Sequence, residues 1–216
     1  MPGLFITLEG PEGSGKSTQI PLLAAWLKSL GWDVLVTREP GGTAIGERVR
    51  ALVHDPQHAE MAATAEILLY SASRAQLVAE VIRPALVAGK IVLCDRYYDS
   101  TYAYQGYGRG LSLEALRQIT EFATTGLRPD VTFLLDLPVE EGLRRRVIGG
   151  EEMNRLDREA VAFHRRVRCG YQTLAAAEPG RWVTVDALAA VDEVQQQLRA
   201  YVRARLLGLT GEEDSH

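Results

Sequence analysis

The sequence of 216 residues has only two cysteines, Cys94 and Cys169, and no long apolar run. Two isolated cysteines make neither a disulfide framework nor a cysteine-rich metal site, and Cys94, within an apolar run, is expected to be a buried thiol. No stretch approaches the roughly 18 apolar residues of a membrane span, and the first residues lack the pattern of a signal peptide. We therefore expect a cytoplasmic protein with no membrane partner.

An excess of charge of one sign is also absent. The net charge is −4, and 24% of the residues are charged, which gives no strong attraction to nucleic acid, so no nucleic-acid partner is expected. There is no internal repeat and no low-complexity linker, and the length suits one domain. We expect a single domain over residues 1–207 and a small, acidic, frayed tail over residues 208–216.

Short apolar runs alternate with longer amphipathic stretches. The short runs read as strands buried on both faces, and they cover residues 4–8, 34–37, 91–94, 131–136 and 182–185. The long stretches have helical spacing of apolar residues, and they cover residues 17–30, 61–87, 113–124, 139–148, 156–177 and 191–207. This alternation predicts an α/β fold with a mostly parallel sheet and helices on both faces.

The clearest motif is GPEGSGKS at residues 10–17. It matches the phosphate-binding P-loop, and it lies between an expected strand and an expected helix, as that loop requires. Gly13 and Gly15 let successive backbone N–H groups turn toward one anion, Lys16 would reach the β- and γ-phosphates, and Ser17 would offer its hydroxyl to Mg²⁺. The predicted ATP-binding residues are Gly10, Pro11, Glu12, Gly13, Ser14, Gly15, Lys16, Ser17 and Thr18.

Several P-loop classes lack their signatures in this chain. A GTPase would show the strings D-x-x-G and N-K-x-D, and neither occurs. A motor or transporter ATPase is usually larger and carries further motifs. The remaining large class is the small-molecule kinase, which binds an acceptor beyond the γ-phosphate.

Three segments follow expected strands, where an α/β sheet builds its ligand site. REPGGT, at residues 38–43, offers Arg38 to a phosphate and Thr43 as the cap of the next helix, although it is also typical of an ordinary turn. Asp95 has the form of a Walker-B acid that serves Mg²⁺, and Arg96 can hold a phosphate through two parallel hydrogen bonds. A strand-end ion pair is the alternative for Asp95 and Arg96.

The third segment, STYAYQG at residues 100–106, combines aromatic rings with an amide. Rings stack on bases, and Gln or Thr can hydrogen-bond a pyrimidine edge. Tyr70 and Arg74 lie four residues apart, so they share one helix face and could hold the same base. Packing in the core is the alternative for each aromatic residue.

A basic cluster contains Arg144, Arg145 and Arg146, followed after two glycines by Arg155 and Arg158. It is typical either of a solvated helix face or of a glycine-hinged lid, about residues 143–158, that closes an arginine on the transferring phosphoryl group. We favour the lid, and the sequence leaves open which arginine acts.

Together these segments resemble the thymidylate kinase family of bacteria. The matching strings GPEGSGKS, REPGGT, YSASR and DRYYDSTYAYQG occur in family order within residues 4–171, together with the basic lid. REPGGT and DR-x-x-x-S-x-x-AYQG are specific to that family. The resemblance implies a P-loop NTPase fold of the nucleoside monophosphate kinase type, with a five-stranded parallel sheet and a lid. It also implies a homodimer, ATP with Mg²⁺ as donor, and dTMP as acceptor.

The resemblance also implies residue roles. Arg96 would bind the dTMP phosphate, Tyr70 would stack on thymine, and Tyr104 would lie under the deoxyribose. The implied dTMP-binding residues are Arg38, Tyr70, Arg74, Arg96, Ser100, Thr101, Tyr104 and Gln105. The implied metal residues are Ser17 and Asp95. The P-loop has no basic residue between Gly10 and Gly15, which is similar to the lid-arginine type. The implied catalytic residues are Lys16, Arg96, Glu12, Arg146 and Arg155.

Two other functions stay open at this point. The chain could phosphorylate another pyrimidine nucleotide or a nucleoside, or it could be a regulatory protein that uses the P-loop as a switch.

Overall fold

The computed structural model describes residues 3–149 and 154–210 of the chain. In this part, five strands form one parallel sheet in the order β2-β3-β1-β4-β5. The strands are β1 Leu4–Glu9, β2 Val34–Arg38, β3 Ile91–Asp95, β4 Val131–Asp136 and β5 Trp182–Asp186. The predicted fold class is confirmed, and each predicted strand ends within one residue of the observed one.

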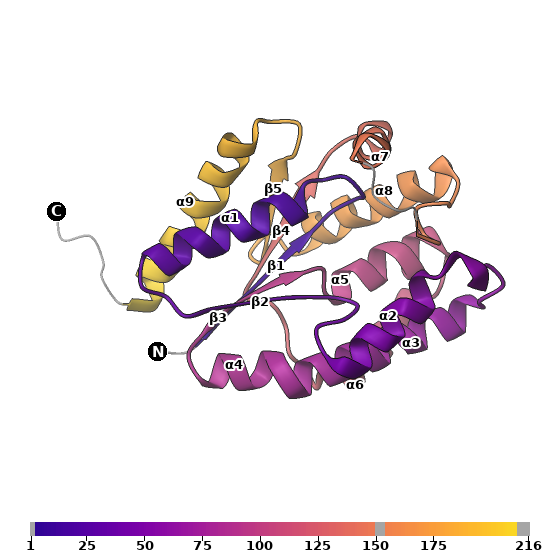
Figure 1. The fold of residues 1–216 in the computed structure, drawn as a ribbon, viewed down its shortest axis with the longest axis horizontal. Helices are drawn as coiled ribbons and strands as arrows, with labels where there is room; N and C mark the ends of the chain where they lie inside the picture. The colour runs from indigo at the N-terminus through magenta and orange to yellow at the C-terminus, as the bar shows by residue number, and fades with distance from the viewer. Residues whose placement is uncertain (1–2, 150–153, 211–216) are drawn as a thin grey trace.

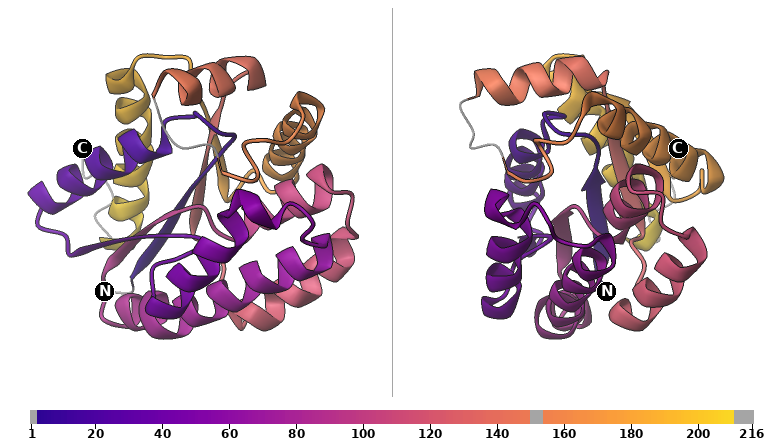
Figure 2. Two further views of the ribbon diagram at one scale, coloured as in Figure 1. Left: turned by 45° about the vertical axis from the view of Figure 1, so that its right-hand side comes forward. Right: turned by 90° about the vertical axis from the view of Figure 1, so that its right-hand side faces the viewer.

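Helices cover both faces of the sheet (Figure 1). On one face α1 Lys16–Ser29 packs beside α9 Val191–Thr210. The other face is covered mainly by α3 Ala63–Leu77, α4 Arg83–Val87 and α8 Val161–Ala177. The remaining α-helices are α2 Ala44–His54, α5 Tyr98–Thr101, α6 Leu113–Thr124 and α7 Val139–Ile148. The turned views in Figure 2 show the helical layers with the sheet between them.

The central strand β1 shows why the sheet is buried on both faces. Ile6 and Leu8 pack in the cluster that contains α1 and α9, while Phe5 packs with Leu77 and Tyr97 on the opposite face. Alternation of side chains along a strand produces this division. The polar Thr7 is tolerated because its hydroxyl pairs with that of Thr132 at 2.8 Å.

Two predicted helices are interrupted or begin later in the structure. The stretch 61–87 is interrupted by a π-helical segment, Val78–Ile82, just before Pro84. Proline has no N–H for the helix ladder and clashes with the preceding turn, so the hydrogen-bond register changes there. The helix expected from residue 156 begins at Val161, because the Asn154 side chain accepts the N–H groups of Leu156 and Asp157 and holds a turn.

The helix α9 continues to Thr210, so the expected tail does not begin at Gly208. Its remainder, residues 211–216, lies outside the described residues, as do residues 150–153 of the expected lid. Across the described ranges, none of the helices has the length and apolar character needed to cross a bilayer. Cys94 is a buried free thiol, as predicted.

Candidate active site

The P-loop joins β1 to α1 and folds around the side chain of Lys16. The Lys16 ammonium donates to the carbonyl oxygens of Gly10 and Pro11 at 3.1 Å and 3.0 Å and to Ser14 Oγ at 3.0 Å. A Cβ at Gly13 would stand 2.1 Å from the carbonyl oxygen of Gly142. Only glycine therefore lets α7 approach the loop this closely.

Arg96 follows β3 in a left-handed backbone conformation, with φ of 67°. Its Nη1 donates to the Gly10 carbonyl oxygen at 3.0 Å and to the Tyr171 hydroxyl at 2.9 Å, and its Nη2 donates to Glu12 Oε1 at 2.9 Å. The ring of Tyr104 lies under the guanidinium, 5.1 Å away. Arg96 is thus held by four residues from three other parts of the chain: the P-loop, α8 and the segment that contains Tyr104.

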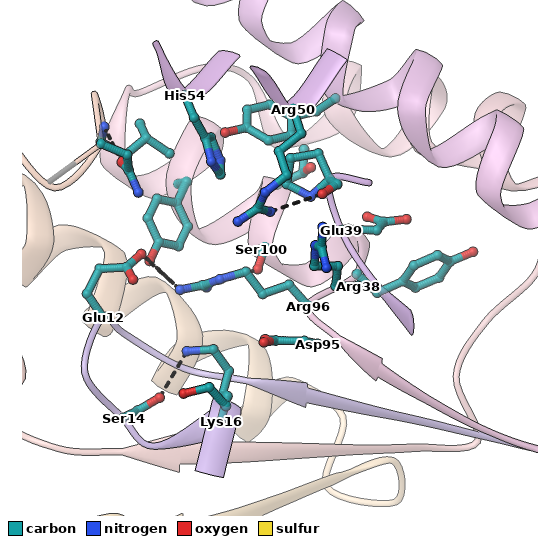
Figure 3. A pocket seen from close by; sticks show the side chains of 18 of the residues that line it. Glu12, Ser14, Lys16, Arg38, Glu39, Arg50, His54, Asp95, Arg96 and Ser100 are labelled. Atoms are coloured by element: carbon teal, nitrogen blue, oxygen red, sulfur yellow. Dashed lines mark hydrogen bonds and ion pairs between the residues drawn. The ribbon is translucent and has the colours of Figure 1, made fainter. Parts of the chain in front are cut away.

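Lys16 and Arg96 line the same cavity of about 510 Å³, as Figure 3 shows. Most of the predicted site residues lie in its wall: Glu12, Gly13, Ser14, Gly15, Lys16, Ser17, Arg38, Tyr70, Arg74, Asp95, Arg96, Ser100, Thr101, Tyr104, Gln105 and Arg146. Gly10 and Pro11 lie behind the wall and contribute the carbonyl oxygens that hold Lys16. Thr18 is not in the wall, and its N–H donates to the Gly15 carbonyl oxygen within the helix start.

A buried ion pair holds part of the cavity wall. Arg74, only 2% exposed, donates to Glu39 Oε2 at 2.8 Å and to Thr101 Oγ1 at 3.0 Å. Burial raises the pKa of Glu39, while Arg74 opposes the shift. Tyr70 lies one helical turn before Arg74 and lines the same region. The predicted shared face of these two residues is confirmed.

The charges near the P-loop shift one another's pKa values. Burial lowers the pKa of Lys16 to about 8, and repulsion from Arg96 adds to the shift. Burial alone would raise the pKa of Glu12, but Arg96 and Lys16 outweigh it and lower this pKa to about 2. Glu12 is therefore ionised at neutral pH and neutralises part of the cationic charge around it.

Glu9 and Tyr171 were missed by the sequence reasoning. Glu9, at the end of β1, is fully buried and accepts the Ser100 hydroxyl at 2.6 Å and the Tyr171 hydroxyl at 2.9 Å. Burial, with repulsion from Asp99, raises the pKa of Glu9 to about 7. The available signal was a charged residue at the end of an otherwise apolar strand.

Two residues of α2 also line the cavity without having been predicted. Arg50 donates to the Pro40 carbonyl oxygen at 3.0 Å, and His54 lies one turn further along the helix. Burial lowers the pKa of His54 to about 4, and Arg50 adds to this shift. The helix itself was expected after Thr43, whose Oγ1 accepts the Gly46 N–H at 2.9 Å as its cap.

The two candidate lid arginines occupy different places. Arg146 lines the cavity and pairs with Asp157. Arg155 does not reach the cavity: it is 7% exposed, pairs with the buried Glu66 and donates to the Val53 carbonyl oxygen at 3.1 Å. A buried carboxylate requires cationic partners, which draws Arg155 away from the site where the sequence reasoning had placed it.

The neighbouring arginines of the expected lid lie on the helix surface. Arg144 and Arg145 both pair with Glu141, at 2.7 Å and 2.8 Å. Their guanidinium groups do not line the cavity, whereas that of Arg146 does. The helical rotation between successive residues explains this difference.

The model of the family described as thymidylate kinase matches residues 8–198. The chain belongs to the thymidylate kinase family. It is similar to a thymidylate kinase of Deinococcus radiodurans, 56% identical over 203 residues that cover 94% of this chain and 98% of the relative. It is also similar to one of Roseiflexus sp. strain RS-1, 53% identical with 96% of both chains covered. The crystal structure of a thymidylate kinase from Ehrlichia chaffeensis superimposes with a TM-score of 0.76 at 32% identity, covering 94% of this chain and 99% of that one.

Proposed function

We propose that this chain transfers the γ-phosphoryl group of ATP to the phosphate of dTMP, giving dTDP and ADP. The observation that carries this proposal is the single cavity that Lys16 of the P-loop shares with Arg96. The other wall of that cavity combines an aromatic ring, a buried guanidinium and an amide, which fits a nucleobase.

The attacking group is a phosphate oxygen of dTMP. A phosphate monoester has its second pKa near about 6, so this oxygen is anionic at neutral pH and no general base is needed. The obstacle is repulsion between two polyanions. Lys16, Arg96 and Arg146 all line the cavity, so they supply cationic charge to the phosphates that it would hold.

The acceptor residues divide by chemistry. Arg96 and Arg38 suit the dTMP phosphate, Tyr70 stacks on the base, and Tyr104 lies beside the sugar. Arg74, Thr101 and Gln105 face the base edge, with Ser100 supporting Arg96 at 3.3 Å. These roles rest on the family's motifs and on the position of each residue in the cavity wall.

We further propose that Mg²⁺ accompanies ATP. Asp95 Oδ1 is buried, and no hydrogen-bond partner for it exists in the described part of the chain, which suits an oxygen ligand for Mg²⁺ or its bound water. Ser17 would add its hydroxyl. Within residues 3–149 and 154–210 no cluster of three or more His, Cys, Asp or Glu could hold a metal. When bound, the ion would neutralise phosphate charge.

We also propose a homodimer packed through helices. Phe122 on α6 is 88% exposed and Leu68 on α3 is 59% exposed, and these two helices pack against each other (Figure 1). Light scattering should give about twice the chain mass of 23.8 kDa. A monomer of 23.8 kDa at micromolar concentration would refute the dimer.

Phosphoryl transfer from γ-labelled ATP to a panel of acceptors tests the function. The panel contains dTMP, dUMP, dCMP, UMP and thymidine. We expect dTMP to be phosphorylated with the highest kcat/KM. A higher kcat/KM for dCMP, UMP or thymidine would identify a different kinase, and the absence of transfer in a single turnover would favour a nucleotide-dependent regulatory protein.

A further inference from the structure

Glu66 lies behind the cavity wall, in α3, and none of the roles above uses it. Its side chain is 0% exposed. It accepts hydrogen bonds from Gln105 Nε2 at 2.7 Å, from Arg109 Nη2 at 3.2 Å and from Arg155. Glu66 thus connects a residue of the cavity wall to two arginines outside it.

Glu66 is ionised in this environment. Burial raises its pKa, but the hydrogen bonds from Arg109, Arg155 and Gln105 outweigh burial, so the net shift is downward. An ionised carboxylate has only acceptor oxygens. The Gln105 atom 2.7 Å from Glu66 Oε1 must therefore be the amide nitrogen, and the alternative orientation of this amide would place two oxygens in contact.

The orientation of Gln105 decides what its side chain offers to a ligand. With Nε2 held by Glu66, the carbonyl oxygen Oε1 is the group left for the cavity that Gln105 lines. No protein donor to this oxygen is found among the described residues. The cavity therefore presents a hydrogen-bond acceptor at this position, and Arg74, which lines the same cavity, supplies a guanidinium donor.

We propose that Glu66 is a specificity-positioning residue that makes Gln105 accept a hydrogen bond from the acceptor base. Thymine and uracil carry an N–H at ring position 3 and an oxygen at position 4, which match an acceptor beside a donor. Cytosine has an unprotonated N3 and an amino group at position 4, the opposite pattern. This inference rests on the proposed function, and it names the group that excludes dCMP.

The discrimination against dCMP follows from the polar groups that dCMP would leave unpaired. In the complex with dCMP, Gln105 Oε1 would face the N3 lone pair, and the guanidinium of Arg74 would face an amino group. A site built to hydrogen-bond one pattern rejects the opposite one because its buried polar groups are left unpaired. Glu66 contributes by preventing the amide rotation that would relieve one of these mismatches.

The test is the ratio of kcat/KM for dTMP over dCMP in wild type and in Glu66→Gln. The neutral amide at position 66 can donate or accept, so it no longer fixes Gln105. We expect the ratio to fall about tenfold or more, the size of one base contact. The fall in the ratio should come from a higher KM for dTMP and a higher kcat/KM for dCMP, with a smaller change in kcat for dTMP. An unchanged ratio in a folded variant overturns the inference.

Matched variants separate positioning from loss of packing. Glu159→Gln removes the ion pair that Glu159 makes with Arg109 at 2.5 Å and leaves the contact with Gln105 intact, so the ratio should not change. A ratio that falls equally in Glu159→Gln contradicts the inference. If Glu66→Gln does not fold, the double variant Glu66→Gln/Arg109→Gln removes the carboxylate together with one half-buried cation, and the ratio must fall as in Glu66→Gln.

A third variant tests the route through Gln105. In Gln105→Leu the ratio should fall as well, and adding Glu66→Gln to it should produce no further fall. A full wild-type ratio in Gln105→Leu overturns the inference. Wild-type enzyme that fails to phosphorylate dTMP would refute the proposed function instead, so the two failures are distinguishable.

Discussion

Lys16 and Arg96 donate hydrogen bonds to one carbonyl oxygen, that of Gly10, at 3.1 Å and 3.0 Å. The oxygen belongs to the P-loop, whereas Arg96 comes from the end of β3. One backbone atom therefore sets the relative positions of the cation that serves ATP and the cation that serves the acceptor phosphate. Glu12 lies beside them and offsets part of their mutual repulsion.

We predict that Arg96→Lys lowers kcat by about 10³-fold, because lysine keeps the charge but cannot hold a phosphate through two parallel bonds. A steady-state assay measures this, and circular dichroism checks the fold. The matched control is Arg128→Lys, on an exposed ion pair with Glu178, which should leave kcat unchanged. Normal kcat in folded Arg96→Lys would remove Arg96 from the reaction.

The lowered pKa of Lys16, about 8, predicts a pH effect on ATP use. In free enzyme, kcat/KM for ATP should fall as pH rises through about 8, because the neutral amine no longer attracts the phosphates. Bound ATP favours the charged form, so kcat at saturating ATP should stay level to higher pH. If both profiles are flat to pH 10, Lys16 does not titrate in this range.

The raised pKa of Glu9, about 7 against a usual 4.5, predicts a pH effect on stability. Between these values the folded state binds more protons than the unfolded state, so this contribution is full below 4.5 and is lost as pH rises through 7. Glu9→Gln should remove this pH dependence, which amounts to about 3 kcal/mol in the free energy of unfolding. Urea unfolding of wild type and Glu9→Gln at pH 5 and pH 7.5 measures it. An equal change in the free energy of unfolding between the two pH values in both proteins would contradict the raised pKa of Glu9.

The two lid arginines should fail in different ways. Arg146→Gln should lower kcat, because Arg146 lines the cavity, and it should also lower the free energy of unfolding, because it removes a partner of the buried Asp157. Arg155→Gln should lower the free energy of unfolding by about 3 kcal/mol, because it removes a partner from the buried Glu66. Kinetics and thermal unfolding of both variants check this. A larger kcat loss in a stable Arg155→Gln protein would show that Arg155 leaves Glu66 during turnover.

A close approach in the P-loop gives a further prediction. Gly13→Ala would place a Cβ 2.1 Å from the Gly142 carbonyl oxygen, at a φ of 69° that L side chains rarely adopt. We expect weaker ATP binding with KM for dTMP less affected. Gly110 has a similar backbone conformation, with φ of 79°, and a Cβ added there would meet no atom within 4 Å. Gly110→Ala therefore controls for backbone strain alone. Equal loss of ATP affinity in both variants would contradict the steric account.

The sequence predicted the sheet well, because continuous apolar runs such as the one before Asp95 occur where a strand is buried on both faces. Motif residues such as Lys16 and Arg96 line the cavity, and the sequence points to them because the spacing of a motif carries its chemistry. Glu9 and Tyr171 were missed because they meet only through folding, 162 positions apart in the chain. Arg155 pairs with Glu66, 89 positions earlier in the chain, and a local sequence pattern cannot reveal such a pair.

The most direct test of the central claim uses a bisubstrate analogue in which adenosine and thymidine are joined by a chain of phosphates. Calorimetric competition should show that the analogue displaces both ATP and dTMP, and that Lys16→Ala and Arg96→Ala each weaken it. An analogue that displaces ATP while dTMP stays bound would show that the two nucleotides do not meet in one cavity.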